Sequence, residues 1–180
     1  MNNHVHHIAV PDKERALSHA FQRIHGAYAI YFNTRHTKTG HLWQGRYKAC
    51  LLDEAHLWNA VRYVERNPIR AELVKRAEEY RWSSAAAHCG LRQDGVLSPG
   101  LPLIESIENW PEWLSVEDPP RDLEFLRSRT RTGRPCTSDE FARELEAKFG
   151  CSLLPKKRGP KRTESNNKAV GLDQNNFDFE

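Results

Sequence analysis

Two short β-rich runs, each followed by a segment with helical spacing, constrain the fold of this chain more than any other feature. Residues 4–10 (HVHHIAV) stop at Pro11 and predict a strand, and Asp12 is expected to cap a helix directly after it. Apolar side chains then recur at helical steps, at Leu17, Phe21, Ile24, Tyr28 and Tyr31. This spacing predicts an amphipathic helix that reaches about Asn33.

The same order of elements repeats in the next part of the chain. Residues 46–52 (RYKACLL) predict a second strand, and Asp53 is expected to cap a second helix. The apolar positions of that helix are Leu57, Val61 and Val64. Pro68 disfavours helical geometry in the residue before it, so the helix is expected to end at or near Asn67.

Beyond residue 90 the pattern is less regular. The chain is divided into a main domain (1–90), a linker with short helices (91–120), a basic helical C-terminal extension (121–162) and a disordered tail (163–180). The last helix of the extension is well marked, because Thr137 and Glu140 fit a capping box and Gly150 follows its apolar face.

The composition is that of a soluble globular protein with a thin core. Hydrophobic residues make up 38%, charged residues 28%, and the formal net charge is +3. None of the four cysteines forms a C-x-x-C pair, which argues against a zinc ribbon or a thioredoxin-like site. No leader is recognisable, and no apolar stretch approaches the roughly 20 residues that span a bilayer. We therefore expect a cytoplasmic protein with free thiols and no membrane partner.

His4 and His6 are candidate metal ligands. Residues at i and i+2 of a strand face the same side, so both imidazoles can reach one divalent ion. In the alternative interpretation, they are partly exposed strand residues near a chain end. The spacing alone does not decide between the two.

Tyr63 and Asn67 form a second candidate pair. Residues at i and i+4 share one face of a helix, so the Asn67 amide oxygen can complete a His-His-Asn site. The Tyr63 hydroxyl, one turn away, can then lie over a phosphate bound to the ion. The alternatives are that Tyr63 is a half-buried packing residue and that Asn67 is an ordinary residue before a proline.

The order of these parts resembles a known family. A strand with His-x-His is followed by a long helix, a second strand and a helix that ends in Y-x-x-x-N-P. The matching segments are N-H-V-H (3–6), G-H-L-W-Q-G-R-Y (40–47), D-E (53–54), R-Y-V-E-R-N-P-I-R-A (62–71), L-V (73–74) and Y-R-W-S-S (80–84). Residues 3–88 thus resemble the single-tyrosine HUH transposases, and most closely the REP-associated tyrosine transposases of bacteria.

The resemblance implies a fold and a set of roles. The fold is α+β, a ferredoxin-like antiparallel sheet with helices on one face, here N-terminally truncated because members usually carry a strand and a helix before the histidine strand. His4, His6 and Asn67 would hold Mg²⁺ or Mn²⁺. Tyr63 would attack DNA to give a 5′-phosphotyrosine and a free 3′-OH. Members occur as monomers and as dimers.

Two other functions stay open at this point. One is a catalytically silent, decayed member of the family that still binds hairpin DNA, and the other is an unrelated metal-dependent phosphodiesterase. DNA linked covalently to tyrosine would distinguish the transposase from both.

Basic and aromatic residues predict the DNA-contacting surface. Stacking on Trp43, with phosphate contacts from its basic neighbours, suits single-stranded or hairpin DNA in a nucleoid-associated protein. The predicted contacts are Arg35, Lys38, His41, Trp43, Gln44, Arg46, Lys48, Arg62, Arg66, Lys156, Lys157, Arg158, Lys161 and Arg162. In the alternatives, Trp43 belongs to the core and the last basic run is a solvated tail.

Overall fold

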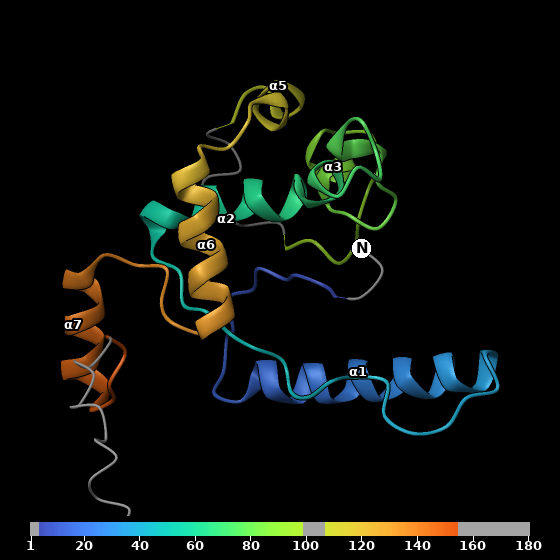
Figure 1. The fold of residues 1–180 in the computed structure, drawn as a ribbon, viewed down its shortest axis with the longest axis horizontal. Helices are drawn as coiled ribbons and strands as arrows, with labels where there is room; N and C mark the ends of the chain where they lie inside the picture. The colour runs from blue at the N-terminus through green and yellow to red at the C-terminus, as the bar shows by residue number, and fades with distance from the viewer. Residues whose placement is uncertain (1–3, 99–106, 155–180) are drawn as a thin grey trace, which may run out of the picture.

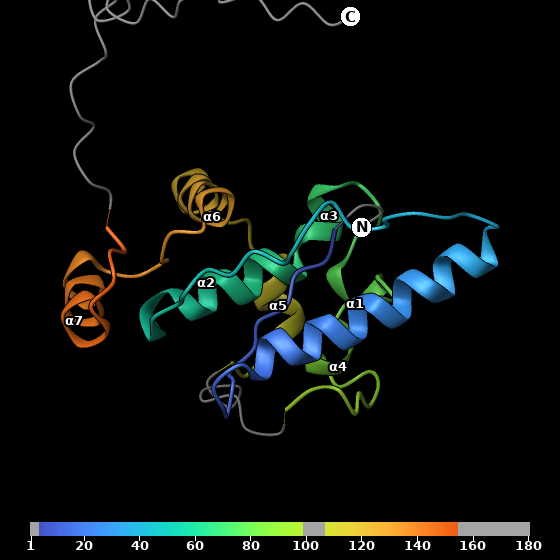
Figure 2. The ribbon, with the colours of Figure 1, turned by 90° about the horizontal axis from the view of Figure 1, so that it is seen from below.

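In the computed structural model, residues 4–98 and 107–154 are described, and they form a helical protein (Figures 1 and 2). In chain order the elements are α1 (Ala16–Arg35), α2 (Glu54–Glu65), α3 (Asn67–Arg70), the 3-10 helix η1 (Ala77–Glu79), α4 (Ala85–His88), α5 (Trp110–Ser115), α6 (Pro120–Thr132) and α7 (Asp139–Phe149). None of the described helices combines the length and the apolar character needed to cross a bilayer.

The predicted antiparallel sheet is not present in the described residues. Residues 4–10, before α1, and residues 46–52, before α2, do not pair with each other, and Figure 1 draws no strand there. A single parallel bridge joins Leu52 to Cys136. β-branched residues favour an extended backbone, but a strand also requires the backbone of a neighbour, and these two segments make no ladder with each other. The expectation of a ferredoxin-like α+β fold is therefore wrong.

α1 packs through one edge only. Its expected cap, Asp12, is wrong, because the helix begins at Ala16 after Arg15 in the left-handed region (φ 64°) without a side-chain cap. The rings of Phe21 and Tyr47 lie 4.7 Å apart, which holds the segment after α1 against the helix. No residue of α1 is fully buried.

α2 begins and ends as predicted. Asp53 caps it by accepting a hydrogen bond from the backbone N–H of His56 at 2.9 Å. The helix ends at Glu65, and α3 starts at Asn67 with Pro68 in its first turn. The second carboxylate oxygen of Asp53 accepts from the backbone N–H of Ser138 at 2.9 Å, which joins the start of α2 to the start of α7.

The C-terminal helices pack on this centre. In Figure 1, α6 crosses α2, and its Leu126 is buried against Ala60 of α2 and Cys136. α7 stops at Gly150 (φ 61°), as predicted, but its cap is Ser138. Thr137 is buried, so the prediction of Thr137 as the cap is wrong by one residue.

A second small core lies on the other side of α2. Val61 packs there with Ala77, Ala85, Trp110 and Leu114, which come from η1, α4 and α5. Ile8, in the segment that carries the histidines, packs against this cluster and also against the cluster of Ala60, Leu126 and Cys136. α2 is therefore the element around which both cores assemble.

Candidate active site

Tyr63 lies half-buried on α2, beside the histidine segment. Its ring meets the ring of His6 nearly edge-on at a centroid distance of 5.9 Å, and His6 in turn lies 5.0 Å from the ring of His4. The guanidinium carbon of Arg70 lies over the Tyr63 ring, 4.4 Å from its centroid. Residues far apart in the sequence thus meet around the tyrosine that the sequence singled out.

Asn67 opens α3, one turn after Tyr63. Its Oδ1 accepts a hydrogen bond from Arg70 Nη2 at 3.0 Å. Arginine has donors and no acceptor, so the side-chain atom that faces it must be the amide oxygen. An amide oxygen has two lone pairs. One therefore remains for a further partner such as a cation.

The environment of His6 favours its neutral form. Burial lowers the pKa of His6, and the nearby positive charges of His4, Arg70 and His7 lower it further. A neutral imidazole keeps the nitrogen lone pair that a metal ion requires. Protonation at acid pH would remove that lone pair.

The side chains that could hold a divalent ion here are His4 and His6, through their ring nitrogens, and Asn67, through its amide oxygen. Across residues 4–98 and 107–154, no three histidine, cysteine or acidic side chains form a group that could hold a metal. A site at this place thus depends on Asn67 as the third protein ligand, beside His4 and His6. The Arg70 charge opposes a nearby cation, although Asp118 offsets it by pairing with the same guanidinium.

Arg62 and Arg66, predicted to contact DNA, are directed toward Asp118. Arg62 Nε lies 2.8 Å from Asp118 Oδ1, while Arg70 Nη1 and Arg66 Nε lie 3.1 Å and 3.5 Å from Oδ2. Arg66 is buried and also donates to the carbonyl of Leu114 at 2.5 Å. These two side chains thus connect α2 to the segment between α5 and α6.

Sequence reasoning missed Arg70 and Asp118. The spacing held a signal for Arg70, because Tyr63, Asn67 and Arg70 follow one another at steps of four and three along one helical face. Asp118 carried no comparable signal. Only the packing of the segment before α6 against α2 brings its carboxylate to the three arginines.

The predicted DNA-contacting residues of the α1 region are at the surface. Those that are exposed are Arg35, Lys38, His41, Gln44, Arg46 and Lys48. Trp43 is half-buried. Its ring stacks on His25 of α1 at 4.2 Å and its Nε1 donates to the His25 carbonyl at 3.0 Å, so one ring face is already covered. Lys156, Lys157, Arg158, Lys161 and Arg162 lie outside the described residues.

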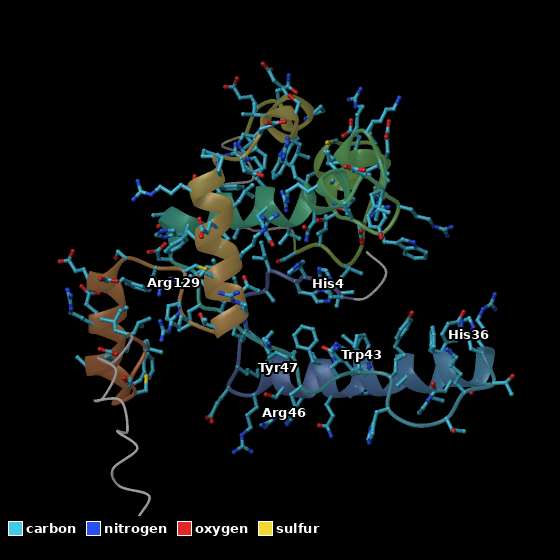
Figure 3. The ribbon with its side chains drawn as sticks, viewed as in Figure 1. His4, His36, Trp43, Arg46, Tyr47 and Arg129 are labelled. Atoms are coloured by element: carbon cyan, nitrogen blue, oxygen red, sulfur yellow. The ribbon has the colours of Figure 1, made fainter. Side chains whose placement is uncertain are left out.

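Figure 3 relates this surface to the histidines. His4 lies between α1 and the α2–α3 region, with Trp43 and Tyr47 along the adjacent edge of α1. A nucleic acid strand that followed α1 would therefore pass close to the histidine segment.

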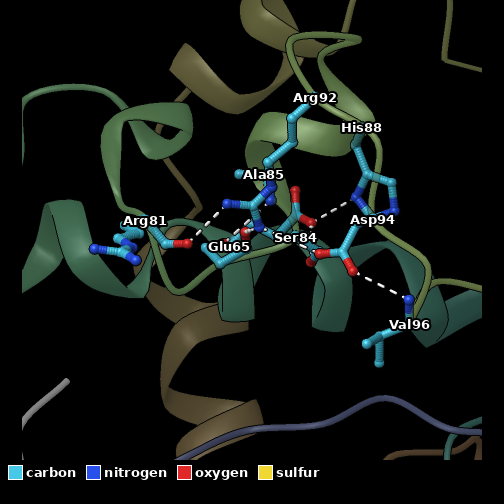
Figure 4. A network of polar contacts seen from close by, with 9 residues as sticks. Glu65, Arg81, Ser84, Ala85, His88, Arg92, Asp94 and Val96 are labelled. Carbon is cyan, nitrogen blue, oxygen red and sulfur yellow. Dashed lines mark hydrogen bonds and ion pairs between the residues drawn. The ribbon is translucent and has the colours of Figure 1, made fainter.

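A buried network next to Tyr63 explains two of the sequence motifs. Glu65 Oε1 accepts from Ser84 Oγ and from His88 Nδ1, each at 2.6 Å (Figure 4). The His88 ring also stacks on Trp110 at 4.5 Å. The hydrogen bond from Ser84 to Glu65 thus joins the Y-R-W-S-S segment to the R-Y-V-E-R-N-P segment.

Residues 1–67, of 180, match the family model described as transposase IS200 like. The match supports the transposase family. It contains His4, His6, Tyr63 and Asn67, whereas Arg70 and Asp118 lie beyond it. DNA transposition by a mobile element is thereby supported as the general function. No protein of curated function and no solved structure matches the chain.

Proposed function

We propose that this chain is a REP-associated single-tyrosine transposase that cleaves and rejoins single-stranded or hairpin DNA through Tyr63. The observation that carries the proposal is the ring contact of Tyr63 with His6, which itself contacts His4. Asn67, one turn along the same face, adds an amide oxygen with a lone pair to spare. The family match over this segment supports the same assignment.

The proposed reaction transfers a backbone phosphorus of the DNA from its 3′ oxygen to the Tyr63 oxygen. The Tyr63 oxygen attacks a backbone phosphorus, a new O–P bond forms, and the bond from phosphorus to the 3′ oxygen breaks. The phenol proton passes to water, and the leaving oxygen takes up a proton to become a free 3′-OH. The 5′-phosphotyrosine conserves the bond energy, so a 3′-OH can later attack it and rejoin the strand.

His4, His6 and Asn67 are the residues that would hold Mg²⁺ or Mn²⁺. When bound, such an ion supplies Lewis-acid polarisation of a phosphate oxygen. The chain's own contribution is to present two imidazoles and an oriented amide beside the tyrosine. Burial of His6 assists, because it lowers the pKa and keeps that ring neutral to a lower pH.

The exposed basic residues along α1 are the proposed phosphate contacts. Arg35, Lys38, Arg46 and Lys48 are all exposed and lie on the helix end and the segment after it. The basic run of residues 156–162 is proposed as a further phosphate-binding arm. With one face of Trp43 covered by His25, base stacking would use the opposite ring face. The transposase would act as a monomer or as a homodimer.

The test is a covalent adduct. The full chain is mixed with labelled hairpin DNA and Mn²⁺ and then denatured. Wild type and Tyr31→Phe should each give a protein–DNA adduct, because Tyr31 is 58% exposed on α1, away from the histidines. Tyr63→Phe, which removes only the hydroxyl, should give none. A Tyr63→Phe adduct, or a wild type that binds hairpin DNA without forming one, would contradict the proposal, and the second result would indicate a silent DNA-binding protein.

A further inference from the structure

Arg70, which was not singled out from the sequence, contacts both Tyr63 and Asn67. Its Nη2 donates to Asn67 Oδ1 at 3.0 Å and to the carbonyl of Tyr63, while its guanidinium covers the Tyr63 ring. Nη1 pairs with Asp118 Oδ2 at 3.1 Å, and the side chain is only 15% exposed. The planar guanidinium of Arg70 thus contacts the proposed nucleophile, the proposed third metal ligand and the carboxylate of Asp118.

We propose that Arg70 is a positioning residue which, held by Asp118, fixes the Tyr63 ring and the Asn67 amide relative to each other. This inference rests on the proposed function, in which Tyr63 attacks DNA and Asn67 completes a metal site. It assigns to the site a residue that lies beyond the segment matched by the family model.

The geometry explains why an arginine is required. A guanidinium offers five N–H donors in one plane, so it can bond two acceptors from α2 and α3 and still pair with a carboxylate. Lysine keeps the charge but concentrates it in one ammonium at the end of a flexible stem. It cannot cover the tyrosine ring and hold both acceptors in the same arrangement.

Asp118 fixes the orientation of that plane. Its side chain is 5% exposed, and it approaches Arg70 from the segment between α5 and α6. A buried carboxylate that lies this close to three arginines has little freedom to move, since each pairing restricts the others. The position of the C-terminal helices is thereby linked to the direction of the Tyr63 ring.

The expected consequence is a change in the orientation of Tyr63 and Asn67 rather than in the binding of DNA. A nucleophile that is misplaced by about 1 Å can lose on the order of 100-fold in rate. A metal ligand without its orienting partner typically weakens metal binding by about 10- to 100-fold. Arg70→Lys should therefore slow adduct formation and weaken Mn²⁺ binding, and should leave hairpin DNA affinity unchanged.

Arg92→Lys is the matched control. Arg92 also donates to two backbone carbonyls, those of Arg81 and Ser83, and pairs with the carboxylate of Asp94. Figure 4 shows these contacts in the network beside α4. Arg92→Lys removes a similar set of guanidinium contacts, at a more exposed ion pair, and none of these contacts involves Tyr63 or Asn67.

The experiment combines activity with a readout that does not need activity. For the full-length wild type, Arg70→Lys and Arg92→Lys, single-turnover adduct rates and Mn²⁺ affinities are measured, together with NMR signals of the Asn67 side-chain amide and the Tyr63 ring. We expect rate and affinity to fall by about 10-fold or more in Arg70→Lys alone, with both NMR signals shifted. Equal effects of the two substitutions would reduce Arg70 to a general stabilising role and overturn the inference.

Asp118→Asn adds a second arm. If Asp118 acts through Arg70, Asp118→Asn should slow the adduct in wild type and add little in the Arg70→Lys background. Fully additive effects contradict the anchoring step. Should Asp118→Asn fail to fold, Arg70→Lys decides the inference. Should wild type form no adduct, the proposed function fails, and the Asn67 and Tyr63 signals alone decide whether Arg70 positions them.

Discussion

α1 and α2 are both amphipathic helices in the sequence, yet the structure uses them differently. α1 has 20 residues and buries none of them fully, whereas α2 has 12 and buries Ala60, Val61 and Glu65. Both small cores assemble on α2, and α1 is held at one edge by aromatic contacts. Helical spacing thus identifies a face that can be buried, but not whether a partner exists to bury it.

The two parts of the candidate site also differ in how firmly the structure holds them. Tyr63, Asn67 and Arg70 belong to the α2–α3 side, where a hydrogen bond and an ion pair hold Asn67 and Arg70 and the Arg70 guanidinium covers the Tyr63 ring. His4 and His6 come from an extended segment that packs chiefly through Ile8. The side of the proposed nucleophile, on α2 and α3, is therefore held by hydrogen bonds and an ion pair, whereas the proposed metal side lies on an extended segment that packs through Ile8.

The largest loss of stability is expected from a substitution at the most buried part of α2. Glu65→Ala would leave Ser84 Oγ and His88 Nδ1 without their shared acceptor. It would also leave a cavity in place of the glutamate side chain, which is 2% exposed. An unsatisfied buried polar group costs about 1–3 kcal/mol, so the two together with the cavity should cost about 3 kcal/mol or more. Urea unfolding measures this loss in the free energy of unfolding.

Ile24→Ala is the control on α1. Ile24 is 59% exposed, and such surface substitutions usually change stability by less than about 0.5 kcal/mol. If Ile24→Ala were as costly as Glu65→Ala, α1 would be as firmly held as α2 and the contrast between the two helices would be lost.

Much of the α2 side was predictable from sequence because its signals are local. Asp53 as a cap and the break before Pro68 each depend on spacing within one short segment. The cap of α7 was predicted one residue too early, at Thr137, because two hydroxyl residues precede the helix and the side chain that accepts from Phe141 N–H is that of Ser138.

The lack of a sheet in the described residues and the pairing of Asp118 with Arg70 could not be predicted in the same way. Residues 4–10 and 46–52 have strand composition, but pairing depends on which backbone lies beside them. Asp118 reaches Arg70 only because α5 and α6 fold back onto α2. Neither fact is encoded in a short window of sequence.

The second prediction concerns the point where the extended segment 46–52 meets the C-terminal helices. Cys50 Sγ lies 3.2 Å from Cys136 Sγ, and the hydrogen bond from the Cys136 thiol lowers the pKa of Cys50 to about 7. A lowered pKa means more thiolate at neutral pH. Cys50 should therefore react with iodoacetamide with a midpoint near pH 7, measured by mass spectrometry in a Cys151→Ala background, because Cys151 is exposed.

Cys89 and a substitution provide the controls. Burial raises the pKa of Cys89 to about 11, so it should stay unreactive over the same range. Cys136→Ala removes the hydrogen bond, and the Cys50 midpoint should rise toward the ordinary value of 9.0. An unchanged midpoint would show that segment 46–52 is not tied to the C-terminal helices through this contact.

A smaller loss of stability than at Glu65 is expected at Ile8, and this substitution tests how the two sides of the candidate site are connected. Ile8 is half-buried and contacts both cores, so Ile8→Ala should cost about 1–2 kcal/mol, below the range for a fully buried isoleucine. Its effect on the site should be larger than this suggests, because Ile8 is the main apolar anchor beside His6. Mn²⁺ affinity measured by calorimetry should fall, while the NMR signal of the Asn67 amide should stay in place, since Arg70 still holds it. Val10→Ala, at a side chain 79% exposed, should change neither quantity. A shift of the Asn67 signal in Ile8→Ala would show that the histidine segment helps to order α3, and that the nucleophile side is not built independently of the metal side.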